Sequence, residues 1–191
     1  MSTLTVTHVT PEEYLAAERL SETRSEYLDG GVCPMTGASL NHGRIVINIA
    51  TELVIQLRGR DCDVLATDTK VRVQGSRKFF YPDVFVFCGG PQFHDDRRDI
   101  ITNPVLVVEV LSPSTEAFDR GAKFEAYRAV ESLKEYVLVS QDRPLAEQYV
   151  RNGDGSWRYR AAAGAESSLA LPSIECTLNL GAVYDRVDFN S

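Results

Sequence analysis

The chain has 191 residues, of which 43% are hydrophobic and 25% are charged, and its formal net charge is -7 at neutral pH. This length allows one domain with a substantial core, which would bury roughly 70% of the surface that the unfolded chain exposes. We expect a single domain over residues 1–191, with its core at about 10–185. The acidic balance argues against a protein whose whole surface binds nucleic acid, because such binding draws on neutralised phosphates.

Membrane and secretion signals are lacking in the sequence. No apolar run approaches the ~20 residues that cross a bilayer, and the N-terminus Met1-Ser-Thr-Leu-Thr has neither the basic nor the hydrophobic region of a signal peptide. We therefore expect a cytoplasmic protein with no membrane partner. The cysteines lack Cys-x-x-Cys spacing and a neighbouring histidine at zinc-ligand spacing, which predicts reduced, partly buried thiols. They are Cys33, Cys62, Cys88 and Cys176.

Two groups of basic residues leave open a local nucleic-acid site on this acidic chain. One group lies around an expected helix at 40–57, and the other precedes Asp83. Together they could form a basic rim, or they could be solvated charges scattered over the surface. The groups consist of Arg44, Arg58 and Arg60, and of Lys70, Arg72, Arg77 and Lys78.

Two helices are expected in the first third of the chain. Thr10 is a capping residue, Pro11 suits the first helical position and a glutamate follows at the third, so a short helix should run to about Glu18. An acidic turn around Tyr27-Leu-Asp-Gly-Gly then borders a short strand or loop. From Leu40 to Leu57, apolar residues recur every four positions, which predicts a core-facing amphipathic helix with His42 in its first turn.

The middle of the chain reads as strands. Residues 63–73 alternate in polarity, residues 79–87 form a second apolar stretch interrupted by Pro82, and Val105–Leu111 is apolar enough for a central strand. Between the last two, residues 88–103 predict a long exposed loop that could gate a site.

The second half predicts a β-α-β unit and a hairpin. Ser112-Pro113 ends the central strand, Asp119 is expected to cap a helix to about Val130, and Glu135–Ser140 forms the next strand. Strands at about 146–151 and 157–162 are joined by Asn152-Gly-Asp-Gly, a strong hairpin signal. A final strand and a short helix around 180–184 complete an α/β domain.

Glu109 is the one carboxylate on the central apolar strand. Desolvating an ionised glutamate costs several kcal/mol without compensation, so Glu109 must be ion-paired, protonated or bound to a metal. If the strand that follows Pro82 is its neighbour, a strand spacing of about 4.8 Å would bring Asp83 alongside Glu109. With the Val110 backbone carbonyl and several waters, these carboxylates would give the oxygen-rich coordination that suits Mg²⁺ or Mn²⁺.

The alternative interpretation needs no metal. Asp83 could be a turn residue after Pro82, and Glu109 could be the buried half of an ion pair with Lys123 or Arg128. Spacing alone leaves both interpretations open.

Several motifs bear a family resemblance. Pro82-Asp83, followed 26 residues after the aspartate by an acid on a hydrophobic strand, resembles the PD-(D/E)xK nuclease superfamily. A narrower similarity, over roughly residues 10–185, is to the Uma-two family of restriction-endonuclease-like proteins. The motifs that carry it are Tyr27-Leu-Asp-Gly, Pro82-Asp-Val, Val108-Glu-Val-Leu-Ser-Pro-Ser114, Asp119-Arg-Gly-Ala-Lys-Phe-Glu-Ala-Tyr127 and Glu135-Tyr-Val-Leu-Val.

The resemblance implies a fold and a set of site residues. The expected fold is α/β (α+β), a restriction-endonuclease-like mixed central β-sheet flanked by helices. Asp83, Glu109 and the Val110 carbonyl would hold the ion. The chain has Leu111 where the superfamily's lysine would stand, and in the resembled family a lysine on the following helix takes that place, which maps onto Lys123. The intrahelical alternative for Lys123 is an i,i+4 pair with Asp119.

Three accessory residues follow from the same resemblance or from their position. Glu26 lies where related nucleases carry a further acid on an N-terminal helix, able to hold a water beside the ion; otherwise it is an exposed helix residue. His42 could bind a substrate phosphate or assist a proton transfer, or it could be structural. Asp119, one helical turn before Lys123, is the third.

The function implied is a Mg²⁺- or Mn²⁺-dependent endonuclease that hydrolyses phosphodiester bonds in nucleic acid, and we expect DNA. A homodimer would suit this role, since paired sites can cut two strands. The alternative is a catalytically degenerate nuclease-fold protein that acts as a nucleic-acid-binding or protein-interaction module.

Overall fold

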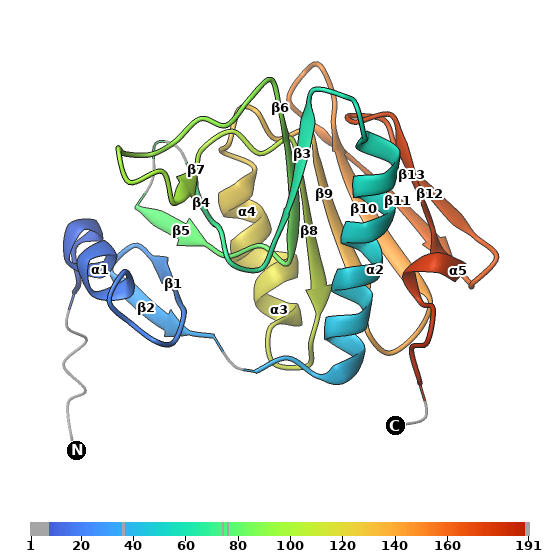
Figure 1. The fold of residues 1–191 in the computed structure, drawn as a ribbon, viewed down its shortest axis with the longest axis horizontal. Helices are drawn as coiled ribbons and strands as arrows, with labels where there is room; N and C mark the ends of the chain where they lie inside the picture. Colours follow the sequence, from blue (N-terminus) through green and yellow to red (C-terminus); the bar gives the residue numbers. More distant parts are fainter. Residues whose placement is uncertain (1–7, 36, 74, 76, 190–191) are drawn as a thin grey trace.

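The computed structural model describes residues 8–35, 37–73, 75 and 77–189. The N-terminal residues on which the prediction about a signal peptide rests therefore lie outside the described residues. Within the described chain the strands form three sheets (Figure 1). Their orders are β11-β10-β9-β8-β6-β3, β2-β1-β5-β4-β7 and β12-β13.

The large sheet is mixed and carries helices on both faces. Pairing is parallel between β8 and β9 and antiparallel between the other neighbours. Alternate residues of β8 pack against α2 (Leu40–Leu57) on one face and against Ala126 and Tyr127 on the other. This confirms the predicted fold class. The strands are β3 (Cys62–Ala66), β6 (Val84–Cys88), β8 (Leu106–Leu111), β9 (Glu135–Ser140), β10 (Leu145–Arg151) and β11 (Trp157–Ala163).

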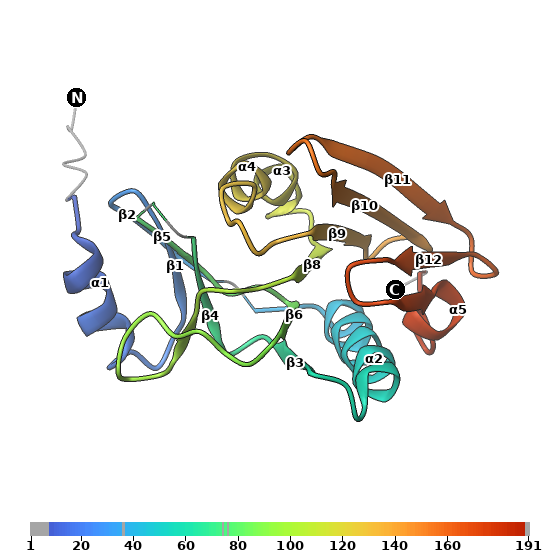
Figure 2. The ribbon, with the colours of Figure 1, turned by 90° about the horizontal axis from the view of Figure 1, so that it is seen from above.

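The small sheet lies beside the large one and is covered by α1 (Pro11–Glu18), as Figure 2 shows. Tyr14 and Leu15 of α1 pack on Tyr27, Phe79 and Ile100. The predicted cap is present, since Thr10 and Glu13 form a reciprocal capping box. The strands are β1 (Ser25–Leu28), β2 (Gly31–Pro34), β4 (Lys70–Val73), β5 (Lys78–Phe80) and β7 (Ile100–Ile101).

Two stretches predicted as strands each divide between the sheets. Residues 79–87 split at Pro82 into β5 of the small sheet and β6 of the large sheet, because proline donates no ladder hydrogen bond. Residues 63–73 split at Thr67, whose φ is 56°, into β3 and β4. The chain thus crosses from one sheet to the other at Thr67 and at Pro82. A hydrogen bond joins these two crossings, since the Thr67 N–H donates to the Asp83 carbonyl at 3.1 Å. The crossings therefore hold Asp83 at the boundary of the two sheets.

The helical run after β8 begins earlier than predicted. It consists of α3 (Glu116–Phe118), a π-helical turn η1 (Asp119–Lys123) and α4 (Phe124–Tyr127). The prediction that Asp119 caps this helix is wrong, because the carbonyls of Ser112 and Thr115 accept the first helical N–H groups. Asp119 is therefore inside the run, where its side chain is buried.

The C-terminal part completes the large sheet and its α2 face. The β-α-β unit is confirmed by the parallel pairing of β8 and β9, and the hairpin by the antiparallel pairing of β10 and β11. The short pair β12 (Ser168–Leu171) and β13 (Cys176–Asn179) leads into α5 (Leu180–Val183), which is tied to α2 by the Asn48 amide. The loop 88–103 contains the short strand β7.

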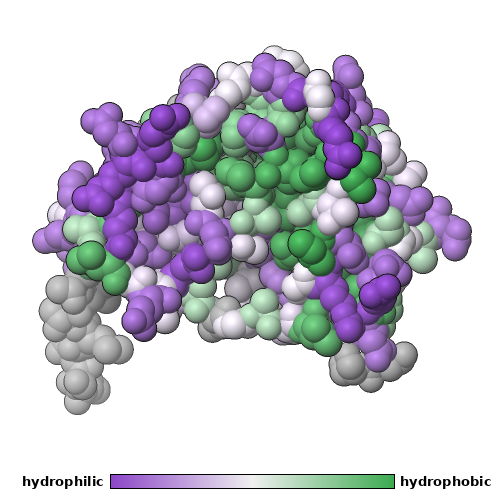
Figure 3. Space-filling model, viewed as in Figure 1, coloured by the Kyte–Doolittle hydropathy of each residue, from purple (hydrophilic) through white to green (hydrophobic). Residues whose placement is uncertain are grey.

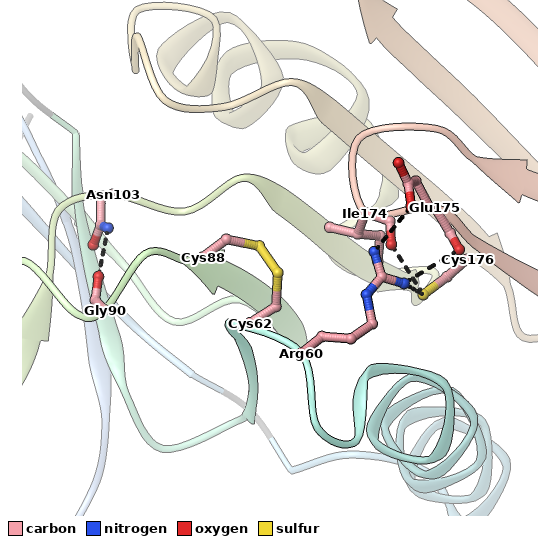
Figure 4. Close-up of a disulfide and its surroundings, with 8 residues drawn as sticks. All are labelled: Arg60, Cys62, Cys88, Gly90, Asn103, Ile174, Glu175 and Cys176. Carbon is pink, nitrogen blue, oxygen red and sulfur yellow. Dashed lines mark hydrogen bonds and ion pairs between the residues drawn. A yellow bond between two sulfur atoms is a disulfide. The ribbon is translucent and has the colours of Figure 1, made fainter.

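The cysteine prediction is wrong for one pair. Cys62 and Cys88 form a disulfide, because the antiparallel register of β3 and β6 places them directly opposite each other (Figure 4). Cys33 is an exposed thiol and Cys176 a buried one, beside Arg60. No described helix combines the length and the apolar character that a membrane crossing requires.

Candidate active site

Asp83 and Glu109 lie on neighbouring strands, as predicted. The β6–β8 register pairs Val84 with Val108, so its continuation by one residue places Asp83 opposite Glu109. The backbone N–H of Val110 donates to Asp83 Oδ2 at 2.7 Å. Glu109 is 3% exposed, whereas the Asp83 side chain is 16% exposed and stands at the end of its strand. One carboxylate of the pair is thus buried and the other is partly accessible to solvent.

Lys123 lies among three carboxylates. Its Nζ is 2.9 Å from Glu109 Oε1, 3.0 Å from Glu26 Oε1 and 3.6 Å from Asp119 Oδ1. Both Lys123 and Asp119 belong to the π-helical turn, and π turns are frequent at functional sites. Lys123 therefore contacts both its i,i+4 partner Asp119 and the strand carboxylate Glu109.

The cluster holds more negative than positive charge in a desolvated place. Burial raises the pKa of Glu109 well above its usual value, against the opposing effect of Lys123. Burial also raises the pKa of Asp119. For Lys123, burial alone would lower the pKa, but Glu109, Glu26 and Asp119 together outweigh it and raise the pKa. A further cation would be favoured here, because it would stabilise the ionised carboxylates.

Two buried oxygen atoms in the cluster lack a hydrogen-bond partner among the described residues, Glu109 Oε1 and Tyr127 Oη. Glu109 Oε1 is within ion-pair distance of Lys123 Nζ, but the contact does not have hydrogen-bond geometry. Buried polar atoms are rarely left in this state, and each such case needs a reason. Acceptor capacity that remains on Glu109 is consistent with a place for a bound ion or water.

Glu26 reaches the cluster from an unexpected element. The sequence expectation of an N-terminal helix is wrong, because Ser25–Leu28 pairs with β2 on one side and β5 on the other and is a strand. Glu26 Oε1 accepts the Tyr81 N–H at 3.0 Å in addition to its contact with Lys123. It therefore ties the small sheet to the helical run.

His42 reaches Asp83 from the other face of the large sheet. It lies in the first turn of α2, whose N-cap residue Ser39 accepts the His42 N–H. The ring Nε2 is 3.2 Å from Asp83 Oδ2. Burial alone would lower the pKa of His42, but Asp83 and the Val110 carbonyl outweigh it and raise the pKa. His42 thus contacts two of the three groups predicted to hold an ion.

The donor set for a metal is small. Among the described residues, no group of three or more His, Cys, Asp and Glu side chains has an arrangement that could hold a metal ion. The remaining donors are Asp83, Glu109 and the Val110 carbonyl. This set fits Mg²⁺ better than a transition metal, because Mg²⁺ takes one or two carboxylates and keeps several waters.

Most of the other charged residues singled out in the sequence make their contacts outside the Lys123 cluster. Arg128 pairs with Glu125 at 2.8 Å on the surface, so it is not the partner of Glu109. In the expected basic rim, Lys70 is buried against Tyr81, Lys78 pairs with Asp29 and Arg60 with Glu175. Arg72 and Arg77 line a separate pocket.

Tyr127, the last residue of α4, was not among the site residues predicted from the sequence. Its ring packs in the core, and burial, followed by the charge of Glu109, raises the pKa of its buried hydroxyl. Its position four residues after Lys123 and eight after Asp119 is the signal that places all three on one helical face.

Comparison with known proteins gives concordant results. The sequence model of the family described as "Uma2: Putative restriction endonuclease" matches residues 11–181. Two uncharacterized proteins of Synechocystis sp. are similar, one 34% identical over 84% of this chain and 91% of its own length, the other 38% identical over 95% and 94%. A structure described as "a putative nuclease belonging to DUF820", from Anabaena variabilis, shares the fold, with a TM-score of 0.75 and 15% identity over 93% of this chain and 98% of that one. The chain belongs to the Uma2 family.

Proposed function

We propose that this protein is a divalent-metal-dependent nuclease that hydrolyses phosphodiester bonds in DNA. The observation that carries the proposal is the pair Asp83 and Glu109 on adjacent strands, with Lys123 Nζ 2.9 Å from the buried member. The family description and the description of the structural neighbour support nuclease chemistry. The word "restriction" in the former favours DNA as the substrate.

In this proposal Asp83, Glu109 and the Val110 carbonyl hold Mg²⁺ or Mn²⁺. The bound ion would supply an activated water and offset charge on a phosphate oxygen. Glu109 has unused acceptor capacity for such an ion. The Val110 N–H, which donates to Asp83 Oδ2 at 2.7 Å, holds the Asp83 carboxylate in place.

Lys123, Glu26 and Asp119 have defined parts in the same proposal. Lys123 would orient the attacking water and oppose the negative charge that develops on the phosphate, a preorganised electrostatic effect. Glu26 and Asp119 restrict the position of its ammonium group from two further sides. His42, 3.2 Å from the partly accessible carboxylate of Asp83, would donate to a substrate phosphate or accept a proton.

The rival function is a noncatalytic nucleic-acid-binding or protein-interaction module. The observation in its favour is that Lys123 already compensates Glu109 electrostatically, as a retained structural pair would. Fold alone does not establish activity. The expected homodimer and the cytoplasmic location stay predictions.

Cleavage of plasmid DNA in Mg²⁺ tests the proposal. Asp83→Asn should lower the rate by about 100-fold or more, because the carboxylate charge at the ion is lost while the shape is kept. Glu166→Gln is the matched control, since Glu166 is exposed and remote in sequence from the cluster. Equal cleavage by wild type and Asp83→Asn, with circular dichroism showing both folded, would contradict the assignment.

A further inference from the structure

A pocket lies on the face of the small sheet that is turned away from the Lys123 cluster. Glu26 and Tyr27 are consecutive in β1, so their side chains point to opposite faces. Tyr27 pairs with Phe79, and Phe79 with Arg72, so these three share the face that α1 covers (Figure 2). The pocket between α1, this face and the loop after β6 has a volume of about 820 Å³, within the range of small-molecule sites.

Arg72 and His94 line this pocket together. Arg72 Nη1 is 2.7 Å from His94 Nδ1. A guanidinium can only donate, so His94 Nδ1 accepts and the imidazole is neutral, with its proton on Nε2. Burial and the charge of Arg72 lower the pKa of His94, in agreement with the neutral form. The lining therefore carries guanidinium N–H groups and an imidazole N–H.

The pocket carries surplus positive charge. Arg19 is compensated by Asp95 and Asp99, at 2.7 and 2.8 Å. In contrast, no described carboxylate lies within ion-pair distance of three further arginines that line the pocket. Apart from Asp95, which pairs with Arg19, the one acidic residue in the described lining is Glu12. The three arginines are Arg72, Arg77 and Arg97. Such a concentration is notable in a chain of net charge -7, and Figure 3 shows the surface over α1 and the small sheet to be mostly hydrophilic.

We propose that this pocket binds a phosphate-bearing ligand. Arg72, Arg77 and Arg97 would pair with the phosphate oxygens, since guanidinium groups suit phosphate geometry. His94 Nε2 would donate a further hydrogen bond. The phosphate can belong to a free nucleotide or to the backbone of a nucleic-acid strand, and only the second source rests on the proposed nuclease function.

Binding measured without divalent ions tests this inference. The probes are ADP, followed by calorimetry, and a fluorescein-labelled single-stranded DNA oligonucleotide, followed by anisotropy. All proteins carry Glu109→Gln, and EDTA is present, so the catalytic site is inactive throughout. Arg72→Gln and Arg77→Gln are each expected to weaken binding about tenfold through loss of charge-assisted hydrogen bonds. Arg158→Gln, at an exposed arginine on β11, is the control and should bind as its parent does.

The outcomes separate the two sources and the two proposals. Weaker binding of ADP assigns the pocket to a nucleotide, and weaker binding of the oligonucleotide alone assigns it to a strand. No binding of either probe, or equal weakening by Arg158→Gln, overturns the proposal. Arg77 is exposed in the turn before β5, so its variant tests the pocket even if Arg72→Gln fails to fold. Absence of nuclease activity would leave these results unaffected.

Discussion

Lys123 is the residue whose environment best defines the cluster. Its side chain is 6% exposed and is surrounded by Glu26, Glu109 and Asp119. Apolar spacing identified Glu109 as a carboxylate in need of compensation, and the resemblance identified Lys123. Neither could predict that Glu26 reaches the cluster from a strand, because the place of β1 in the small sheet depends on the pairing of Tyr27 with Phe79 and of Leu28 with Lys78, which are distant in the sequence.

Removing the Lys123 ammonium group should destabilise the folded protein. Lys123→Met is expected to lower the free energy of unfolding at pH 7 by about 3 kcal/mol, because it leaves buried carboxylates uncompensated. Denaturant unfolding measures the change, with the exposed Lys134→Met as control. If an ion binds at Glu109, Mn²⁺ should restore more stability to Lys123→Met than to Lys134→Met. A stability loss no larger than that of the control would contradict the described contacts.

Glu135 provides a pH-dependent prediction. Burial raises its pKa to about 7, only partly offset by Ser173, Gln148 and Arg160. Because the folded-state pKa lies above the ordinary value of 4.5, the folded protein binds more protons between these values. The folding advantage of the protonated form is full below about pH 4.5 and is lost as the pH rises through about 7.

Glu135→Gln removes this titration. The unfolding free energy of the variant minus that of wild type should therefore increase from pH 5 to pH 8, by at most about 3 kcal/mol. Urea unfolding at the two pH values measures the gain, and Glu131→Gln, at an exposed position, is the control. An identical pH dependence in wild type and Glu135→Gln would show that the carboxyl is not perturbed by burial.

At the scale of elements, α2 shows what local sequence predicts well. Its bounds agree with the apolar four-residue spacing, since the cap at Ser39 and the buried stripe are both local properties. The strands around Pro82 and Thr67 were predicted as strands, but their division between two sheets was not, because sheet membership depends on distant partners. The same holds for the Cys62–Cys88 disulfide, which follows from the β3–β6 register.

Two isoleucines of α2 offer a matched comparison. Ile49 is fully buried against the large sheet, whereas Ile47 is 61% exposed on the opposite side of the helix. Ile49→Ala should cost about 2–5 kcal/mol of unfolding free energy through lost burial and the remaining cavity. Ile47→Ala should change it by less than about 0.5 kcal/mol, as surface substitutions do. Similar losses in both variants would place α2 on the sheet in a different orientation.

At the scale of the whole molecule, the site exists because the two sheets meet. Asp83 follows the crossing at Pro82, Glu26 comes from the small sheet, Glu109 from the large one and Lys123 from the helical run between them. The disulfide lies in the large sheet and links β3 to β6. Between these two strands the chain forms β4 and β5 of the small sheet. The sheets, their helices and the cluster thus form one connected arrangement.

The disulfide should contribute to the stability of this arrangement. It closes a segment with a sequence separation of 26 residues. Replacing both Cys62 and Cys88 by alanine should therefore lower the unfolding free energy by about 2–4 kcal/mol under oxidising conditions. A reducing agent should destabilise wild type but not the double variant, as measured by thermal unfolding. Equal sensitivity of both proteins would contradict the disulfide.

The central claim is that Asp83 and Glu109 together hold a divalent ion, and calorimetric titration of Mn²⁺ at neutral pH tests it most directly. We predict saturable binding to wild type and to the surface control Glu166→Gln, with the binding lost in Glu109→Gln although circular dichroism shows that variant to be folded. Unchanged saturable binding in Glu109→Gln, or its absence from wild type, would contradict the claim and leave the buried Lys123–Glu109 contact as a structural ion pair.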